Sequence, residues 1–249
     1  QYYGSGKREN APVTAFQSML VVAASFPVIL ALVPFAKYLF SVMGVPASQI
    51  GYQCDYIDVL AFGVLPGMMR HALGCYFSGI GRTKIVMFAT LTAMAVNVLL
   101  DYILIFGNFG APALGIKGAA IATICGSVSA VVILLYAYFS REHRCEFSVM
   151  KSFRFDPTVM KQLLYFGYPA GVEFFLNFCA FSFMILIFHS QGDDVATAST
   201  IMFNWDLVAF IPLLGIEIAV TSLVGRYMGA GEPGIAHRSA MSGIRTGIW

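Results

Sequence analysis

Long apolar runs separated by short polar segments dominate the chain. About 20 helical residues at 1.5 Å each cross the roughly 30 Å hydrocarbon core of a bilayer. The pattern predicts six complete membrane helices, at residues 13–38, 57–80, 85–106, 118–139, 163–189 and 195–224. Prolines inside these runs predict kinks, and we expect residues 163–189 to be broken near Gly167 and Pro169. Residues 232–249 have the pattern of the start of a seventh helix.

The polar segments between the helices predict how the chain is divided. Residues 44–53 are expected to be a loop, and residues 107–117 a glycine-rich turn. The longest polar segment, residues 141–161, carries many bases. We therefore expect residues 1–140 to form part of one lobe with four membrane helices. Residues 141–161 would then be a basic linker, and residues 162–249 would begin a second lobe.

Composition supports a polytopic membrane protein. Hydrophobic residues make up 58% of the chain and charged residues 11%, whereas a soluble domain has about 25% charged residues. The net charge of +2 gives no reason to expect a nucleic-acid partner. The five cysteines are scattered without metal or redox spacing, so we interpret them as small packing residues.

The basic residues predict the orientation in the membrane. When the loops are numbered alternately, one set holds only Lys37 and Lys117. The other set holds eleven cations: Lys7, Arg8, Arg82, Lys84, Arg141, Arg144, Lys151, Arg154, Lys161, Arg226 and Arg238. By the positive-inside rule the second set is cytoplasmic. The asymmetry also supports six helices, because a miscounted helix would mix the two sets.

A short repeat lies near the two ends of the chain. Residues 1–6 (QYYGSG) align with residues 226–231 (RYMGAG) at an offset of 225, and Ala11 aligns with Ala236. Both copies fall on cytoplasmic loops of the same kind. This period predicts two homologous halves of six helices each, related by an axis along the membrane normal.

One carboxylate lies within an apolar run. Asp101 is the only formal charge in residues 85–107, and Asn97 lies one helical turn before it on the same face. Thr123 begins the polar edge of the next helix. Carboxylate, amide and hydroxyl oxygens suit a small hard cation such as sodium, or a proton. Alternatively, Asn97 and Thr123 only join the helices by hydrogen bonds, and Asp101 lies in interfacial water.

Several motifs together resemble the multidrug and toxic compound extrusion (MATE) transporters. These motifs are GRTK at 81–84, NVLLDYILIFG at 97–107, GIKGAAIAT at 115–123, GYPAG at 167–171 and LVGRYMGAG at 223–231. The resemblance implies an all-α fold of twelve helices in two lobes, of which this chain holds helices three to eight. It also implies antiport, in which sodium or a proton enters while a cationic or amphipathic compound leaves across the cytoplasmic membrane.

The resemblance also implies site residues. Asp101, Asn97 and Thr123 match the family's first-lobe cation site, which in the family also uses an aspartate on the first helix. In the second lobe many members carry a glutamate where this chain has Asn177. Glu173, one turn earlier, is the candidate replacement. We expect a monomer with a small organic substrate in a lipid bilayer, and no cofactor beyond the coupling ion.

Other readings of the sequence remain open at this point. A lipid-linked oligosaccharide flippase of related architecture would line its cavity with several cations, whereas Arg70 is the one base well inside a predicted helix. An intramembrane enzyme would need a catalytic motif, and none is recognisable, so we do not expect an enzyme. A channel would need a selectivity filter. Because the chain begins without Met and stops in an apolar-leaning segment, we expect an internal fragment of a longer protein.

Overall fold

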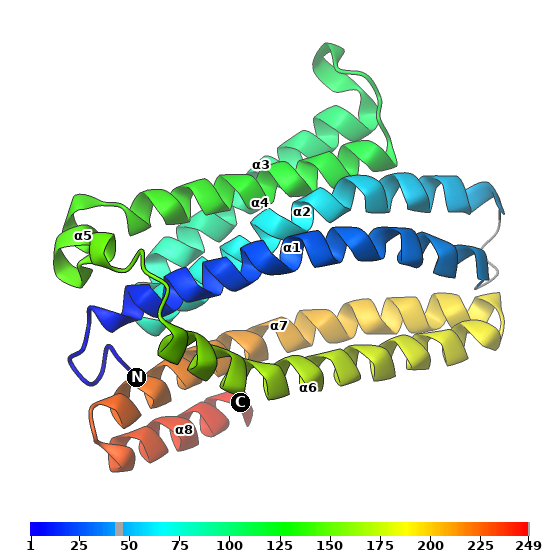
Figure 1. Ribbon diagram of the computed structural model, residues 1–249. Coiled ribbons are helices and arrows are strands. Elements are labelled where there is room, and N and C mark those ends of the chain that lie inside the picture. Colours follow the sequence, from blue (N-terminus) through cyan, green and yellow to red (C-terminus); the bar gives the residue numbers. More distant parts are fainter. Residues whose placement is uncertain (43–46, 249) are drawn as a thin grey trace. The chain divides into compact units, whose positions relative to one another are not determined.

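The structure is a computed structural model that describes residues 1–42 and 47–248 (Figure 1). All regular elements in these residues are helices. Two are short 3₁₀ turns, η1 (Asn108–Gly110) and η2 (Val149–Lys151). The α-helices are α1 (Asn10–Val42), α2 (Ala47–Gly79), α3 (Thr83–Phe106), α4 (Ile116–Tyr138), α5 (Arg141–Phe147), α6 (Pro157–Ser190), α7 (Asp193–Gly229) and α8 (Pro233–Ile248). The all-helical fold class predicted from the sequence is confirmed.

Five of these helices are long and apolar enough to span a membrane: α1, α3, α4, α6 and α7. The sixth predicted span is α2, which has 33 residues and is therefore long enough. It is more polar because it carries Asp55 and Asp58 near its start and Arg70 and His71 further along. Contacts with neighbouring helices can support such residues inside a membrane, where lipid cannot.

The chain divides into two compact units, which we call the α1–α5 unit and the α6–α8 unit. The first comprises residues 8–154, and the second comprises residues 1–7 together with residues 155–249. The boundary between them falls inside the segment 141–161, which the sequence marked as a linker. Most of that segment is folded, because α5 and η2 pack into the α1–α5 unit through the buried residues His143, Phe147 and Val149.

In the α1–α5 unit, α4 packs along both α2 and α3, and α1 packs on α2 (Figure 1). One face of α4 is made of small buried residues, Ala122, Gly126 and Ala130. The largest buried side chains gather where α2 and α4 approach α5: Leu73, Phe77, Leu134, Tyr138, His143 and Phe147. Small residues at the interface bring membrane helices close together, since lipid provides no hydrophobic drive for their association.

Two sequence-based predictions of helix limits were wrong. Residues 47–53 are the first turns of α2 rather than a loop, and the remaining positions 43–46 of the predicted interruption lie outside the described residues. α6 runs through Gly167 and Pro169 as one α-helix instead of breaking there. A proline removes a single backbone hydrogen bond, and membrane helices tolerate that loss.

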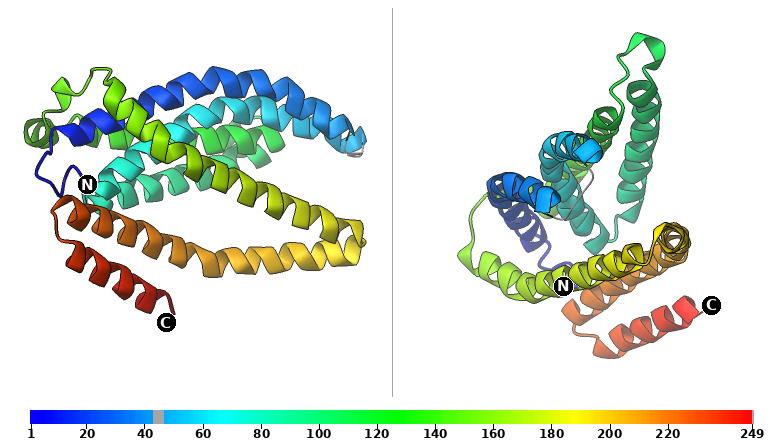
Figure 2. Two further views of the ribbon diagram at one scale, coloured as in Figure 1. Left: turned by 60° about the horizontal axis from the view of Figure 1, so that its bottom comes forward. Right: turned by 90° about the vertical axis from the view of Figure 1, so that its right-hand side faces the viewer.

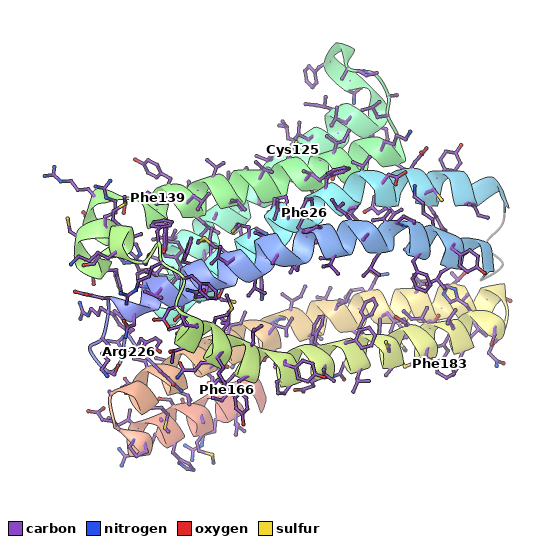
Figure 3. All side chains as sticks on the ribbon, in the orientation of Figure 1. Phe26, Cys125, Phe139, Phe166, Phe183 and Arg226 are labelled. Atoms are coloured by element: carbon purple, nitrogen blue, oxygen red, sulfur yellow. The ribbon has the colours of Figure 1, made fainter. Side chains whose placement is uncertain are left out.

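In the α6–α8 unit, α6 and α7 form a long hairpin that turns at Gly192, and α8 folds back along α7 (Figure 2). Gly192 has a φ of 113°, a conformation that favours glycine. Asp156 caps α6, since its carboxylate accepts the backbone N–H groups of Thr158 and Val159. Aromatic side chains of α6, among them Phe166 and Phe183, project outward and are exposed (Figure 3).

Candidate functional site

Asp101 lies on α3, five residues before the helix ends at Phe106. Its side-chain atom Oδ1 is buried and has no hydrogen-bond partner among the residues that the structure describes. A buried carboxylate oxygen without a donor is costly, because it has lost water and gained nothing in return. This oxygen is therefore the position on α3 at which a hydrogen-bond donor is missing.

Asn97 and Thr123 link α3 to α4 one helical turn before Asp101. The Asn97 side-chain Nδ2 donates to Thr123 Oγ1 at 3.5 Å, and Thr123 Oγ1 donates to the Ala119 carbonyl at 3.0 Å. With Nδ2 engaged by Thr123, the carbonyl oxygen Oδ1 is the atom of Asn97 suited to bind a cation. Thr123 is exposed, and Asn97 and Asp101 are half-buried. The structure thus brings Asn97 and Thr123 together across the two helices, and their role as cation ligands stays a prediction.

Two glycines of α4 determine how closely the two helices approach. A Cβ at Gly118 would lie 2.6 Å from the Leu104 carbonyl oxygen, and one at Gly126 would lie 2.8 Å from the Ala93 carbonyl oxygen. The second position would also lie 3.2 Å from the Asn97 Cβ. A larger residue would separate the helices at both ends of the segment that holds Asn97 and Thr123.

The face of α3 that carries Asn97 and Asp101 differs from its apolar face. A shallow hollow on the apolar face is lined only by apolar side chains: Met94, Ala95, Val98, Leu99, Tyr102, Ile103 and Phe109. Neither Asn97 nor Asp101 contributes to it. The helix therefore separates an apolar surface from a polar stripe, as its spacing predicts.

The candidate pair in the α6–α8 unit has a different environment. Glu173 and Asn177 are both exposed, one turn apart on α6. The Asn177 side chain donates to the backbone carbonyl of Glu173 at 3.0 Å. This bond lies within the helix and leaves the Glu173 carboxylate uninvolved. The role of the two residues stays a prediction.

Sequence reasoning missed the ion pairs at the two ends of the α1–α5 unit. At one end Glu146 pairs with Arg82 at 2.6 Å and with Arg8 at 3.2 Å. At the opposite end α2 supplies both partners, since Asp58 pairs with Lys37 at 2.6 Å and Asp55 with Lys117 at 3.2 Å. Lys37 and Lys117 are the only cations of the set predicted to lie outside the cytoplasm. The sequence feature that could have predicted the second group of ion pairs is the presence of Asp55 and Asp58 near the start of α2.

Comparisons with known proteins agree with these features. The family model MatE matches residues 1–103 and 169–249. A probable multidrug resistance protein NorM from Thermotoga maritima is 30% identical over 92% of this chain, which covers 49% of that protein. The protein of the same name from Bacillus thuringiensis is 29% identical over 98% of the chain and 54% of its own length. The chain thus spans about half the length of these relatives.

Solved structures show the same fold. A MOP superfamily transporter from Pyrococcus furiosus superposes with a TM-score of 0.86 at 20% identity, over 98% of this chain and 53% of that one. A MATE in complex with Br-NRF gives a TM-score of 0.80 at 20% identity, over 98% and 56%. These likenesses establish the architecture. Since the family model covers well over half of the sequence, the chain belongs to the MatE family of multidrug and toxic compound extrusion transporters and is part of a multi-pass membrane protein.

Proposed function

We propose that the full-length protein is a cation-coupled antiporter that exports cationic or amphipathic organic molecules across the cytoplasmic membrane as a monomer. In this mechanism sodium or a proton binds at Asp101, with Asn97 and Thr123 as neutral oxygen partners. The observation that carries the proposal is the buried, unpartnered Oδ1 of Asp101 beside the Asn97–Thr123 contact. The multidrug resistance names of the relatives support the direction and class of transport.

The chemistry of the three side chains explains the coupling. A carboxylate inside a membrane protein is stabilised when a cation or a proton neutralises it. The ion therefore binds best in whichever packing of the helices brings the three oxygens together. A ligand that prefers one conformation shifts the population toward it, and an ion gradient can then drive the exchange of conformations.

The test uses the full-length protein in proteoliposomes, with sodium and pH gradients imposed separately. Efflux of a fluorescent organic cation should follow one of the gradients. Asp101→Asn keeps the size of the side chain and removes its charge, so it should abolish gradient-driven efflux while expression and reconstitution stay normal. Asp206→Asn on α7, where Asp206 is exposed, is the matched control for losing one acid from a long apolar helix. Gradient-driven efflux by Asp101→Asn at the wild-type rate would refute the proposal.

A further inference from the structure

The short repeat at offset 225 has the same backbone structure in both copies. Ser5 N–H donates to Gln1 O at 2.9 Å, and the equivalent Ala230 N–H donates to Arg226 O at 3.0 Å. Gly6 and its equivalent Gly231 have φ angles of 77° and 76°. The aligned alanines, Ala11 and Ala236, are both buried. The repeat found in the sequence is therefore also a repeat of local structure.

The two copies contact each other, and the contact is reciprocal. A Cβ placed on Gly4 would overlap the backbone carbonyl of Arg226. A Cβ placed on Gly229 would overlap the backbone carbonyl of Gln1. Gly229 is the equivalent of Gly4, and Arg226 is the equivalent of Gln1. Each glycine thus receives the carbonyl that begins the other copy, inside the α6–α8 unit.

A reciprocal contact locates a symmetry axis. When residue i of one copy contacts residue j of the other, and j of the first contacts i of the second, the contact lies on a two-fold axis. For two halves of six helices, the predicted axis runs along the membrane normal. The reciprocal crossing is the local contact that such an axis would produce, and the positive-inside rule assigns its two loops to the cytoplasmic side.

We propose that the crossing of residues 1–6 with residues 226–231 at Gly4 and Gly229 is the cytoplasmic seal of the transport path, and that it separates when the path opens inward. The proposal rests on the proposed transport function, because a seal has a role only if the protein has a transport path to close. The contact is formed by backbone atoms of both copies. The two copies can therefore come together without a rearrangement of large side chains. Each glycine is required because a carbonyl group occupies the place of its Cβ.

Side chains beside the crossing add a limited stabilisation. The Arg226 guanidinium lies 5.0 Å from the centre of the Tyr3 ring, and Arg226 itself lies near the end of α7 (Figure 3). The Tyr2 hydroxyl donates to the Gln162 side-chain oxygen at 3.3 Å. A cation–π contact at an exposed site is weak, so these side chains add little to the cost of separating the crossing.

The first test is substitution in the full-length protein. Gly4→Ala and Gly229→Ala should each reduce efflux about tenfold, because the closed conformation is lost from the cycle. Gly79→Ala and Gly234→Ala are the matched controls. Both glycines lie on the same side of the membrane, and a Cβ at either position meets open space. The controls should pump at the wild-type rate, and wild-type efflux by both Gly4→Ala and Gly229→Ala would refute the proposal.

The second test measures the contact itself and needs no knowledge of substrate or coupling ion. In a background without cysteine, Ser5→Cys and Ala230→Cys together should be joined by a short bifunctional maleimide. Adding Gly229→Ala should lower the yield of this cross-link several-fold, because the new Cβ would overlap the Gln1 carbonyl and separate the two copies. No cross-link, or an equal cross-link yield with and without Gly229→Ala, would overturn the seal. If the seal behaves as expected but the wild type moves no organic cation, the proposed function fails and the contact stands.

Discussion

The Tyr76 hydroxyl lies 2.8 Å from Nε2 of His143, and both residues are buried. This hydrogen bond joins α2 to the short helix α5. The His143 ring also packs on Phe147, with ring centres 4.6 Å apart, and lies among Phe77 and Tyr138. His143 thus anchors α5 to α2 and α4.

The environment of His143 predicts a loss of stability in acid. Burial and the nearby charge of Arg82 lower the pKa of the His143 imidazole to about 4, although Glu146 acts in the opposite direction. In the unfolded chain the pKa is about 6.5. Between these values the unfolded state binds more protons, so the stabilisation is complete above pH 6.5 and is lost as the pH falls toward 4. The melting temperature in detergent should fall over this interval.

His143→Gln provides the comparison. The amide can still hydrogen-bond Tyr76 but does not titrate, so the melting temperature should depend less on pH between 6.5 and 4. His237→Gln is the control, because His237 is exposed and belongs to the other unit. A His143→Gln protein with the same pH dependence as the wild type would show that another group causes the acid sensitivity.

Asn97→Ala should weaken cation binding without abolishing transport. A neutral ligand contributes about the free energy of one hydrogen bond, so the apparent affinity for the coupling ion should fall about tenfold. The maximal efflux rate at saturating ion should change little, in contrast to Asp101→Asn. Efflux measured against ion concentration separates the two effects. An unchanged half-saturation concentration would remove Asn97 from the site.

The glycines of α4 should be sensitive to added volume. Gly126→Ala places its Cβ against the Ala93 carbonyl and should destabilise the α3–α4 pair by about 1–3 kcal/mol. Gly74→Ala on α2 is the control, since its Cβ would be 3.8 Å from the nearest Val86 carbon, an ordinary contact. In detergent, the melting temperature of the Gly126→Ala protein should be well below that of the Gly74→Ala protein. Equal melting temperatures would mean that the two helices do not need this close approach.

The orientation can be tested with cysteines at opposite ends of the α1–α5 unit. Cys145 on α5 is exposed and should react with an impermeant maleimide only from the cytoplasmic side. Ala113→Cys, in the exposed turn before α4, should react only from the other side. Each cysteine is tested alone in an otherwise cysteine-free protein. Labelling of both from the same side would contradict the assigned topology.

The sequence predicted the helix limits well where interactions between residues close in the sequence are enough to end a helix. The limits of α3 and α4 fall within two residues of prediction, because polar turns and glycines end those apolar runs. Gly107 shows the reason, since its left-handed conformation caps α3 and its N–H bonds the Ile103 carbonyl. The break expected at Pro169 was wrong, because the propensity of one residue is weaker than the cost of unpaired backbone in a membrane.

The sequence by itself determined that this is an all-α membrane protein, that Asp101 is the one formal charge in residues 85–107, and that the chain carries a repeat. Those properties follow from composition, helical period and spacing, which are local. Only the tertiary structure decided that Asn97 reaches Thr123, that Oδ1 of Asp101 is buried without a partner, and that Gly4 and Gly229 each receive the other copy's carbonyl. Such contacts depend on how helices that are distant in the sequence pack together. The pattern of residues along the chain does not specify the distance between two packed helices or the rotation of one relative to the other.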